Sequence, residues 1–158
     1  MRETHLKPMG NLSGNVVQSP PGRTERKGDK NMMERNNKHV LVVDDDYDIR
    51  YILSLRLVSA GYMVYAAANG LEALEQMKKH PIDVVLTDYR MPKMDGFKFL
   101  SLCHVSWPGI PVVVFSGDQD DLAHEAIERG AFAWVRKGSD FTMLLEILAA
   151  AFQQSVHA

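Results

Sequence analysis

The chain has 158 residues, 46% of them hydrophobic, which is enough for one domain with a sizeable core plus an extension. Residues 1–38 carry eight Lys/Arg against four Asp/Glu, whereas residues 39–158 carry ten against sixteen, so the compact part is acidic and unsuited to direct nucleic-acid binding. A single cysteine excludes an internal disulfide and a cysteine zinc cluster, and no apolar run is long enough to span a bilayer, so we expect a cytoplasmic protein.

Residues 1–37 are predicted to form a disordered tail, followed by one folded domain over residues 38–158. Prolines and glycines punctuate this polar stretch, and its longest apolar run is Val16-Val17. Such a segment buries too little apolar surface to offset the entropy lost on ordering. A basic arm with a function of its own is the less favoured alternative.

From His39 onward, apolar strand patterns alternate with helical patterns. The expected strands are 39–43, 62–66, an apolar run at 84–86 that ends at Asp88, 112–115 and 132–135. The expected helices are one that stops at Gly61 and four over about 69–79, 96–105, 118–129 and 140–154. The residues expected to face inward are Ile49, Ile52, Leu53, Leu57 and Ala60 in the first helix and Leu71, Leu74 and Met77 in the second. Five strands that alternate with five helices predict an α/β fold, in which a parallel sheet is covered on both faces and joined by right-handed crossovers.

Reactive side chains follow four of these strands. They are the triplet Asp44, Asp45 and Asp46 after the first strand, Asp88 after the third, Ser116 at the end of the fourth and Lys137 after the fifth. Because the carboxyl ends of parallel strands lie along one edge of the sheet, we expect these side chains to converge in the crevice where open α/β sheets bind ligands.

The chemistry of this set points to phosphoryl transfer. Clustered carboxylates repel one another, and a hard divalent cation such as Mg²⁺ relieves that repulsion. The cation would also neutralise an incoming phosphoryl group, which Asp88 could then attack to form an acyl phosphate. Lys137 and Ser116 would stabilise the phosphoryl oxygens.

Four motifs in this order resemble the receiver domain of two-component response regulators. The motifs are Val-Leu-Val-Val-Asp-Asp-Asp at 40–46, Leu-Thr-Asp-Tyr-Arg-Met-Pro-Lys-Met-Asp-Gly at 86–96, Val-Val-Phe-Ser-Gly at 113–117 and Val-Arg-Lys-Gly at 135–138. The resemblance covers residues 39 to about 154 and implies a flavodoxin-like sheet with the strand order 2-1-3-4-5.

The resemblance also implies a role for each site residue. Asp88 matches the phosphoacceptor, Asp45 the direct Mg²⁺ ligand, Asp44 its neighbour, and the backbone carbonyl of Arg90 a third protein ligand. Ser116 and Lys137 match the residues that contact the phosphoryl group, and Trp134 stands at the aromatic switch position, where Tyr or Phe is more frequent.

One departure from the family pattern concerns the backbone after the lysine. Lys137 is followed by Gly138, where the family usually has a proline after a cis bond. A cis bond before a non-proline residue costs about 2.5–4 kcal/mol, so we predict a trans bond with Gly138 absorbing the changed path.

The resemblance also implies partners. We expect a sensor histidine kinase or a histidine phosphotransfer protein to donate the phosphoryl group, and a downstream protein to bind the face formed by the fourth helix, fifth strand and fifth helix. A homodimer is a further option. Since the sequence stops soon after the fifth helix, a free-standing receiver of the chemotaxis-regulator type is expected, one that acts as a signalling module and catalyses only its own phosphorylation and dephosphorylation.

Other readings of the same motifs are weaker or remain open. A calcium loop starting at Asp44 would need Gly where Ile49 stands. A dehalogenase-like phosphatase would need Thr or Val where Asp48 stands, and a flavin module would need a phosphate loop where the Asp triplet stands. The serious alternative is an interaction scaffold of the same fold that works without phosphorylation.

Overall fold

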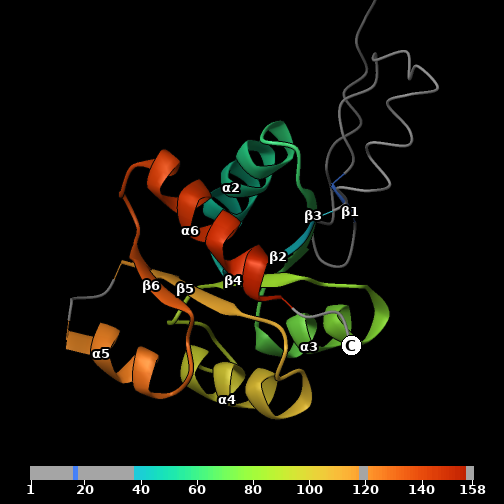
Figure 1. Ribbon diagram of the computed structural model, residues 1–158. Helices are drawn as coiled ribbons and strands as arrows, with labels where there is room; N and C mark the ends of the chain where they lie inside the picture. Colours follow the sequence, from blue (N-terminus) through green and yellow to red (C-terminus); the bar gives the residue numbers. More distant parts are fainter. Residues whose placement is uncertain (1–15, 18–37, 118–120, 156–158) are drawn as a thin grey trace, which may run out of the picture.

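The computed structural model describes residues 16–17, 38–117 and 121–155 (Figure 1). The strands are β1 (Val16–Val17), β2 (His39–Val43), β3 (Met63–Ala67), β4 (Val84–Thr87), β5 (Val112–Ser116) and β6 (Ala133–Arg136). The helices are α2 (Tyr47–Ser59), α3 (Gly70–Lys79), α4 (Gly96–Ser106), α5 (Asp121–Glu128) and α6 (Phe141–Gln154). Within these ranges, no helix has both the length and the apolar character that crossing a bilayer requires.

Five parallel strands form the body of the sheet, in the spatial order β3-β2-β4-β5-β6. This is the predicted flavodoxin-like order 2-1-3-4-5, with five helices between and after the strands, so the predicted fold class is confirmed. The short strand β1 adds an antiparallel pair to the outer edge of β3, with Val16 opposite Tyr65 and Val17 opposite Val64. No strand was expected there, and the other residues of the predicted tail lie outside the described ones.

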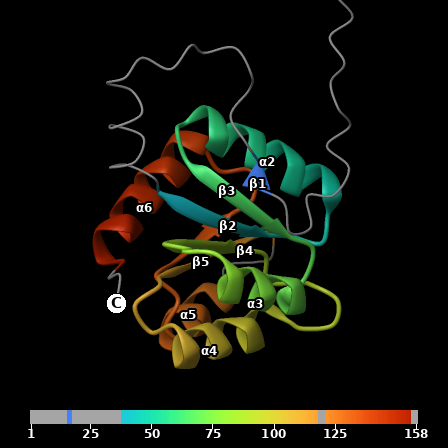
Figure 2. The same cartoon turned by 90° about the vertical axis from the view of Figure 1, so that its right-hand side faces the viewer.

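The sheet forms the middle of three layers. Helices α2 and α6 cover one face, and α3, α4 and α5 cover the other (Figures 1 and 2). Along β2, Val40 and Val42 pack with the first pair of helices, whereas Leu41 and Val43 pack with the second group. Both faces of this strand are therefore buried, which explains why its sequence is a continuous apolar run.

Carboxylate and amide side chains determine where the helices begin. Asp46, Asn69, Asp95 and Asp140 are the N-cap residues of α2, α3, α4 and α6, and each side chain accepts a backbone N–H from the first turn. After α2, Gly61 has a φ of 99°, a backbone conformation that favours glycine and ends the helix.

The buried face of α2 agrees with the predicted one only in part. Leu53 and Leu57 are buried as expected, but Ile52, which was also expected to face inward, is 54% exposed, and Arg50 and Ser54 are buried on this face. Two polar side chains thus occupy the face that meets the sheet.

A similar difference occurs in α3, where Leu71 was expected to face inward but is 50% exposed. Helix α5 was expected to begin at Asp118; it is described from Asp121, and residues 118–120 lie outside the described part of the chain.

Candidate functional site

The carboxyl ends of β2, β4, β5 and β6 form one edge of the sheet, as predicted. Val43 is paired with Thr87, and the backbone N–H of Asp88 donates to the Val43 carbonyl at 2.8 Å. On the other side of β4, Thr87 is paired with Val114, two residues before Ser116. The end of β4 is therefore the centre of this edge, and Asp88 lies on it.

Three carboxylates meet at this position. One oxygen each from Asp44, Asp45 and Asp88 lies within 4.8 Å of the others. Asp44 is 2% exposed and Asp88 is 6% exposed, whereas Asp45 is open to solvent. Two backbone N–H groups orient the buried pair, because Asp46 donates to Asp44 Oδ1 at 2.9 Å and Tyr89 donates to Asp88 Oδ1 at 2.8 Å.

The ammonium group of Lys137 lies between the two buried carboxylates. Lys137 Nζ is 2.8 Å from Asp44 Oδ2 and 3.3 Å from Asp88 Oδ2. The backbone N–H of Lys137 donates to the Ser116 carbonyl at 3.0 Å, which ties the lysine to the end of β5. No peptide bond among the described residues is cis, so the Lys137–Gly138 bond is trans as predicted, and Gly138 takes a φ of 90°.

Charge and burial oppose each other at this site. Burial, followed by the Asp44 carboxylate, raises the pKa of Asp88, although Lys137 acts in the opposite direction. For Lys137, burial lowers the pKa, but the hydrogen bonds and charges of Asp44 and Asp88 outweigh it, so the net shift is upward. The two upward pKa shifts thus have different causes: burial and the Asp44 carboxylate disfavour the charged form of Asp88, whereas the two carboxylates favour the charged form of Lys137.

The loop after β4 is held tightly against the site. Gly96 donates its N–H to the Tyr89 carbonyl at 2.8 Å, and a Cβ at position 96 would lie only 2.7 Å from Tyr89 Cα. Met94 is buried against Gly70 at the start of α3. The Asp95-Gly96 pair thus starts α4 and also keeps the loop close to Asp88.

An aromatic cluster lies next to this loop. The ring of Tyr89 packs against Phe97, with centroids 4.6 Å apart, and against Trp134, with centroids 6.0 Å apart. Trp134 is partly buried, and its indole Nε1 is buried without a hydrogen-bond partner among the described residues. The residue at the predicted switch position therefore contacts the neighbour of Asp88 in sequence.

Two further residues of the predicted site, Ser116 and Arg90, lie near the carboxylates. Ser116 is buried at the end of β5, and Arg90 lies two residues after Asp88 on an exposed loop, where the role of its carbonyl stays a prediction. No role was predicted for Tyr89 or for Arg50. The guanidinium Nη1 of Arg50 donates a hydrogen bond to the Asp44 carbonyl. Arg50 stands three residues before Leu53 and seven before Leu57 on the buried face of α2, and this helical spacing was the signal that could have identified it.

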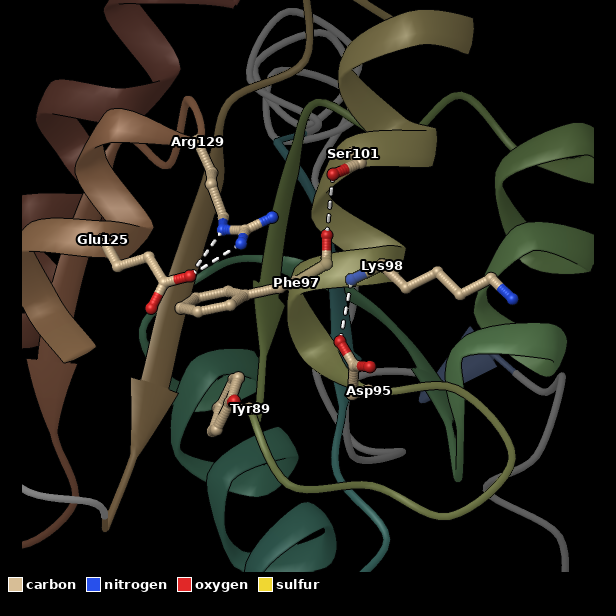
Figure 3. Close-up of a pocket in the computed structure, with 7 residues that line it drawn as sticks. All are labelled: Tyr89, Asp95, Phe97, Lys98, Ser101, Glu125 and Arg129. Atoms are coloured by element: carbon tan, nitrogen blue, oxygen red, sulfur yellow. Dashed lines mark hydrogen bonds and ion pairs between the residues drawn. The ribbon is translucent and has the colours of Figure 1, made fainter.

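A hollow of about 370 Å³ opens between α4 and α5 (Figure 3). Its lining residues are Tyr89, Asp95, Phe97, Lys98, Ser101, Glu125 and Arg129. The Arg129 guanidinium lies over the Phe97 ring and bonds to Glu125, while the Lys98 side chain points away from this pair. None of the three clustered carboxylates lines the hollow, so it is distinct from the acidic site.

The acidic cluster fits a hard divalent cation. Three carboxylates offer the oxygen ligands that Mg²⁺ prefers, and two of them, Asp44 and Asp88, already attract one cationic group, the ammonium of Lys137. A cation there would be bound by Asp44, Asp45 and Asp88.

Comparison with known proteins places this arrangement in a family. The model of the response regulator receiver domain matches residues 40–149. Among curated proteins, the chain is 34% identical over 128 residues to the transcriptional regulatory protein GlrR of Escherichia coli and 40% identical over 113 residues to ZraR of Klebsiella oxytoca. These matches cover 80% and 71% of this chain but only 29% and 26% of the relatives, so the chain spans about a quarter of their length.

Solved structures give the same result. A receiver domain protein from Clostridium thermocellum superposes with a TM-score of 0.70 and 30% identity, covering 74% of this chain and 95% of that one. The chemotaxis response regulator CheY4 of Vibrio cholerae superposes with a TM-score of 0.68 and 32% identity, covering 73% of this chain and 99% of that one. TrrA of Thermotoga maritima, solved in complex with Mg²⁺ and BeF, superposes with a TM-score of 0.68 and 26% identity. This match covers 72% of this chain and 98% of that one. The chain therefore belongs to the family of response regulator receiver domains.

Proposed function

We propose that Asp88 accepts a phosphoryl group from a phosphohistidine of a sensor histidine kinase or a phosphotransfer protein, and that this modification changes partner binding. The observation that carries the proposal is the position of Asp88 at the end of β4, with the Lys137 ammonium 3.3 Å away and two further carboxylates within 4.8 Å. A nucleophile flanked by a cation and by potential metal ligands is suited to phosphoryl transfer.

Transfer of the phosphoryl group from the phosphohistidine to Asp88 needs no further reactant. A carboxylate oxygen of Asp88 forms a bond to phosphorus, the bond from phosphorus to the donor imidazole nitrogen breaks, and the imidazole keeps the electron pair and takes up a proton. The product is an acyl phosphate on Asp88. The chain in this way catalyses its own modification, and hydrolysis of the acyl phosphate resets it.

Side chains of the chain itself stabilise the charge that moves. Lys137 already contacts the Asp88 carboxylate, so it can pair with a phosphoryl oxygen when that carboxylate becomes phosphorylated. Ser116, at the end of the neighbouring strand β5, supplies a hydroxyl on the same edge of the sheet. A Mg²⁺ ion bound by Asp44, Asp45, Asp88 and the Arg90 carbonyl would neutralise the incoming phosphoryl group.

Support for the metal and the partners comes from the relatives. TrrA was crystallised with Mg²⁺ and BeF, and the curated relatives are transcriptional regulators. We infer that this receiver acts in the cytoplasm and that phosphorylated Asp88 alters the face of α5, β6 and α6, where a downstream protein or a second copy binds. Trp134 on β6 and Ser116 would be the switch residues.

A labelling experiment tests the proposal. With a small-molecule phosphodonor and Mg²⁺, the protein should gain one phosphoryl group that is stable in acid and labile in base, measured by intact mass. Asp88→Asn should gain none, while the exposed control Glu146→Gln should be labelled like wild type. Equal labelling of Asp88→Asn would exclude Asp88 as the acceptor, and an unlabelled wild type would favour the phosphorylation-independent scaffold.

A further inference from the structure

Arg50 is a buried arginine directly behind the acidic site. It is the fourth residue of α2 and is only 6% exposed. Its Nη1 donates to the Asp44 carbonyl, its Cζ lies 5.5 Å from the centre of the Tyr47 ring, and its Nε is buried without a partner among the described residues. Burying a guanidinium group is costly unless its interactions compensate, so this position needs a reason beyond packing.

Another arginine on the same helix shows the difference. Arg56 is exposed, and its guanidinium lies 5.0 Å from the centre of the Phe141 ring, on the part of α2 that is remote from the carboxylates. An arginine on α2 can therefore remain solvated. Arg50 instead donates a hydrogen bond to the backbone carbonyl of Asp44, a residue of the acidic site.

That hydrogen bond completes the support of Asp44. The N–H of Asp44 donates to the Ala67 carbonyl at 3.2 Å, and its side chain accepts the N–H of Asp46 at 2.9 Å. The carbonyl of Asp44 belongs to the peptide group that leads into Asp45, and Arg50 is the donor to this carbonyl. The orientation of that peptide determines where the exposed Asp45 carboxylate points.

We propose that Arg50 is a positioning residue that fixes the Asp44–Asp45 peptide, so that both carboxylates face Asp88 and together bind a divalent cation. The inference rests on the proposed function, because it assigns Arg50 to the metal-binding part of that site. Residues that orient metal ligands from behind typically change metal affinity by about 10–100-fold when they are replaced.

The test is a Mg²⁺ titration followed by calorimetry, with urea unfolding in EDTA as the measure of fold stability. Arg50→Met should weaken Mg²⁺ binding about tenfold. Arg50→Lys, which keeps an N–H donor and the charge, should restore most of the affinity, and the matched control Arg56→Met should bind like wild type. Labelling of Asp88 in Arg50→Met should recover at saturating Mg²⁺, because the nucleophile itself is unchanged.

The outcomes separate this inference from the proposed function. A wild type that binds no Mg²⁺ would contradict the metal site itself. A wild type that binds Mg²⁺ and an Arg50→Met that binds equally well would contradict only the positioning role, as would equal losses in the Met and Lys variants. If Arg50→Met does not fold, Arg50→Gln replaces it with the same expected order, and failure of both to fold in excess Mg²⁺ would assign Arg50 to the core and overturn the inference.

Discussion

At the scale of single residues, the charge of Asp88 is unfavourable for the fold. Burial of its carboxylate and the neighbouring Asp44 carboxylate raise the pKa of Asp88 above its ordinary value of 3.8, although Lys137 acts in the opposite direction. The folded state consequently binds this proton more tightly than the unfolded state does. Stability from this group is present at low pH and is lost as the pH rises from 3.8 through the raised pKa of the folded state.

This sign leads to a prediction for the unphosphorylated protein in EDTA. Asp88→Asn should raise the melting temperature at pH 7 by a few degrees, because the amide removes the buried charge while Lys137 keeps its contact with Asp44 at 2.8 Å. The gain should shrink as the pH falls toward 3.8, where the wild-type carboxyl becomes protonated in both states. Differential scanning calorimetry across pH measures the effect, and the exposed control Glu146→Gln should show no such gain; a loss of stability in Asp88→Asn at pH 7 would contradict the argument.

At the scale of the elements, the sequence identified α2 and its buried Leu53 and Leu57 but wrongly placed Ile52 on the same face. An apolar stripe through Ile52 was expected, yet the buried face contains Arg50 and Ser54. The helical pattern was read from apolar side chains alone, whereas a buried face can also hold polar side chains that form hydrogen bonds. Arg50 bonds to the Asp44 carbonyl, and Ser54 bonds to the Arg50 carbonyl at 2.6 Å, and neither partner is visible in a helical pattern.

Strand β6 supports a second prediction, which concerns Trp134. Its indole N–H is buried without a partner among the described residues, and leaving such a donor unpaired costs about 1–3 kcal/mol. A second orientation that pairs this N–H would relieve the cost. Phosphorylation of Asp88, acting through Ser116 and the neighbouring Tyr89 ring, should shift the population toward it.

Tryptophan fluorescence measures this shift. In a Trp107→Phe background, Trp134 is the remaining tryptophan of the chain, and beryllofluoride with Mg²⁺ should change its emission maximum or its quenching. The same addition to Asp88→Asn should have no effect. If the wild-type spectrum does not change although beryllofluoride binds, Trp134 is fixed packing and the proposed switch lies elsewhere.

At the scale of the whole molecule, alternation of strands and helices was sufficient to place the site. Parallel strands end at one edge, so Asp44, Asp88, Ser116 and Lys137 had to converge although they are far apart in sequence. What the pattern could not give is the sharing of one ammonium group between two carboxylates, because that depends on side-chain reach across three strands. It also missed β1, since two valines in a polar stretch carry no strand pattern of their own.

The last prediction concerns the stability of the whole domain in Mg²⁺. A ligand that binds only the folded state stabilises it by about 2.7 kcal/mol at about 100 times its Kd. Mg²⁺ should therefore raise the melting temperature of wild type by several degrees, because it neutralises carboxylates that lie within 4.8 Å of one another. Asp45→Ala should lose most of this response yet keep its fold in EDTA, because Asp45 is exposed and contributes little to the core. A melting temperature that is indifferent to Mg²⁺ in wild type, or an equal response in Asp45→Ala, would show that these carboxylates do not act together as a cation site.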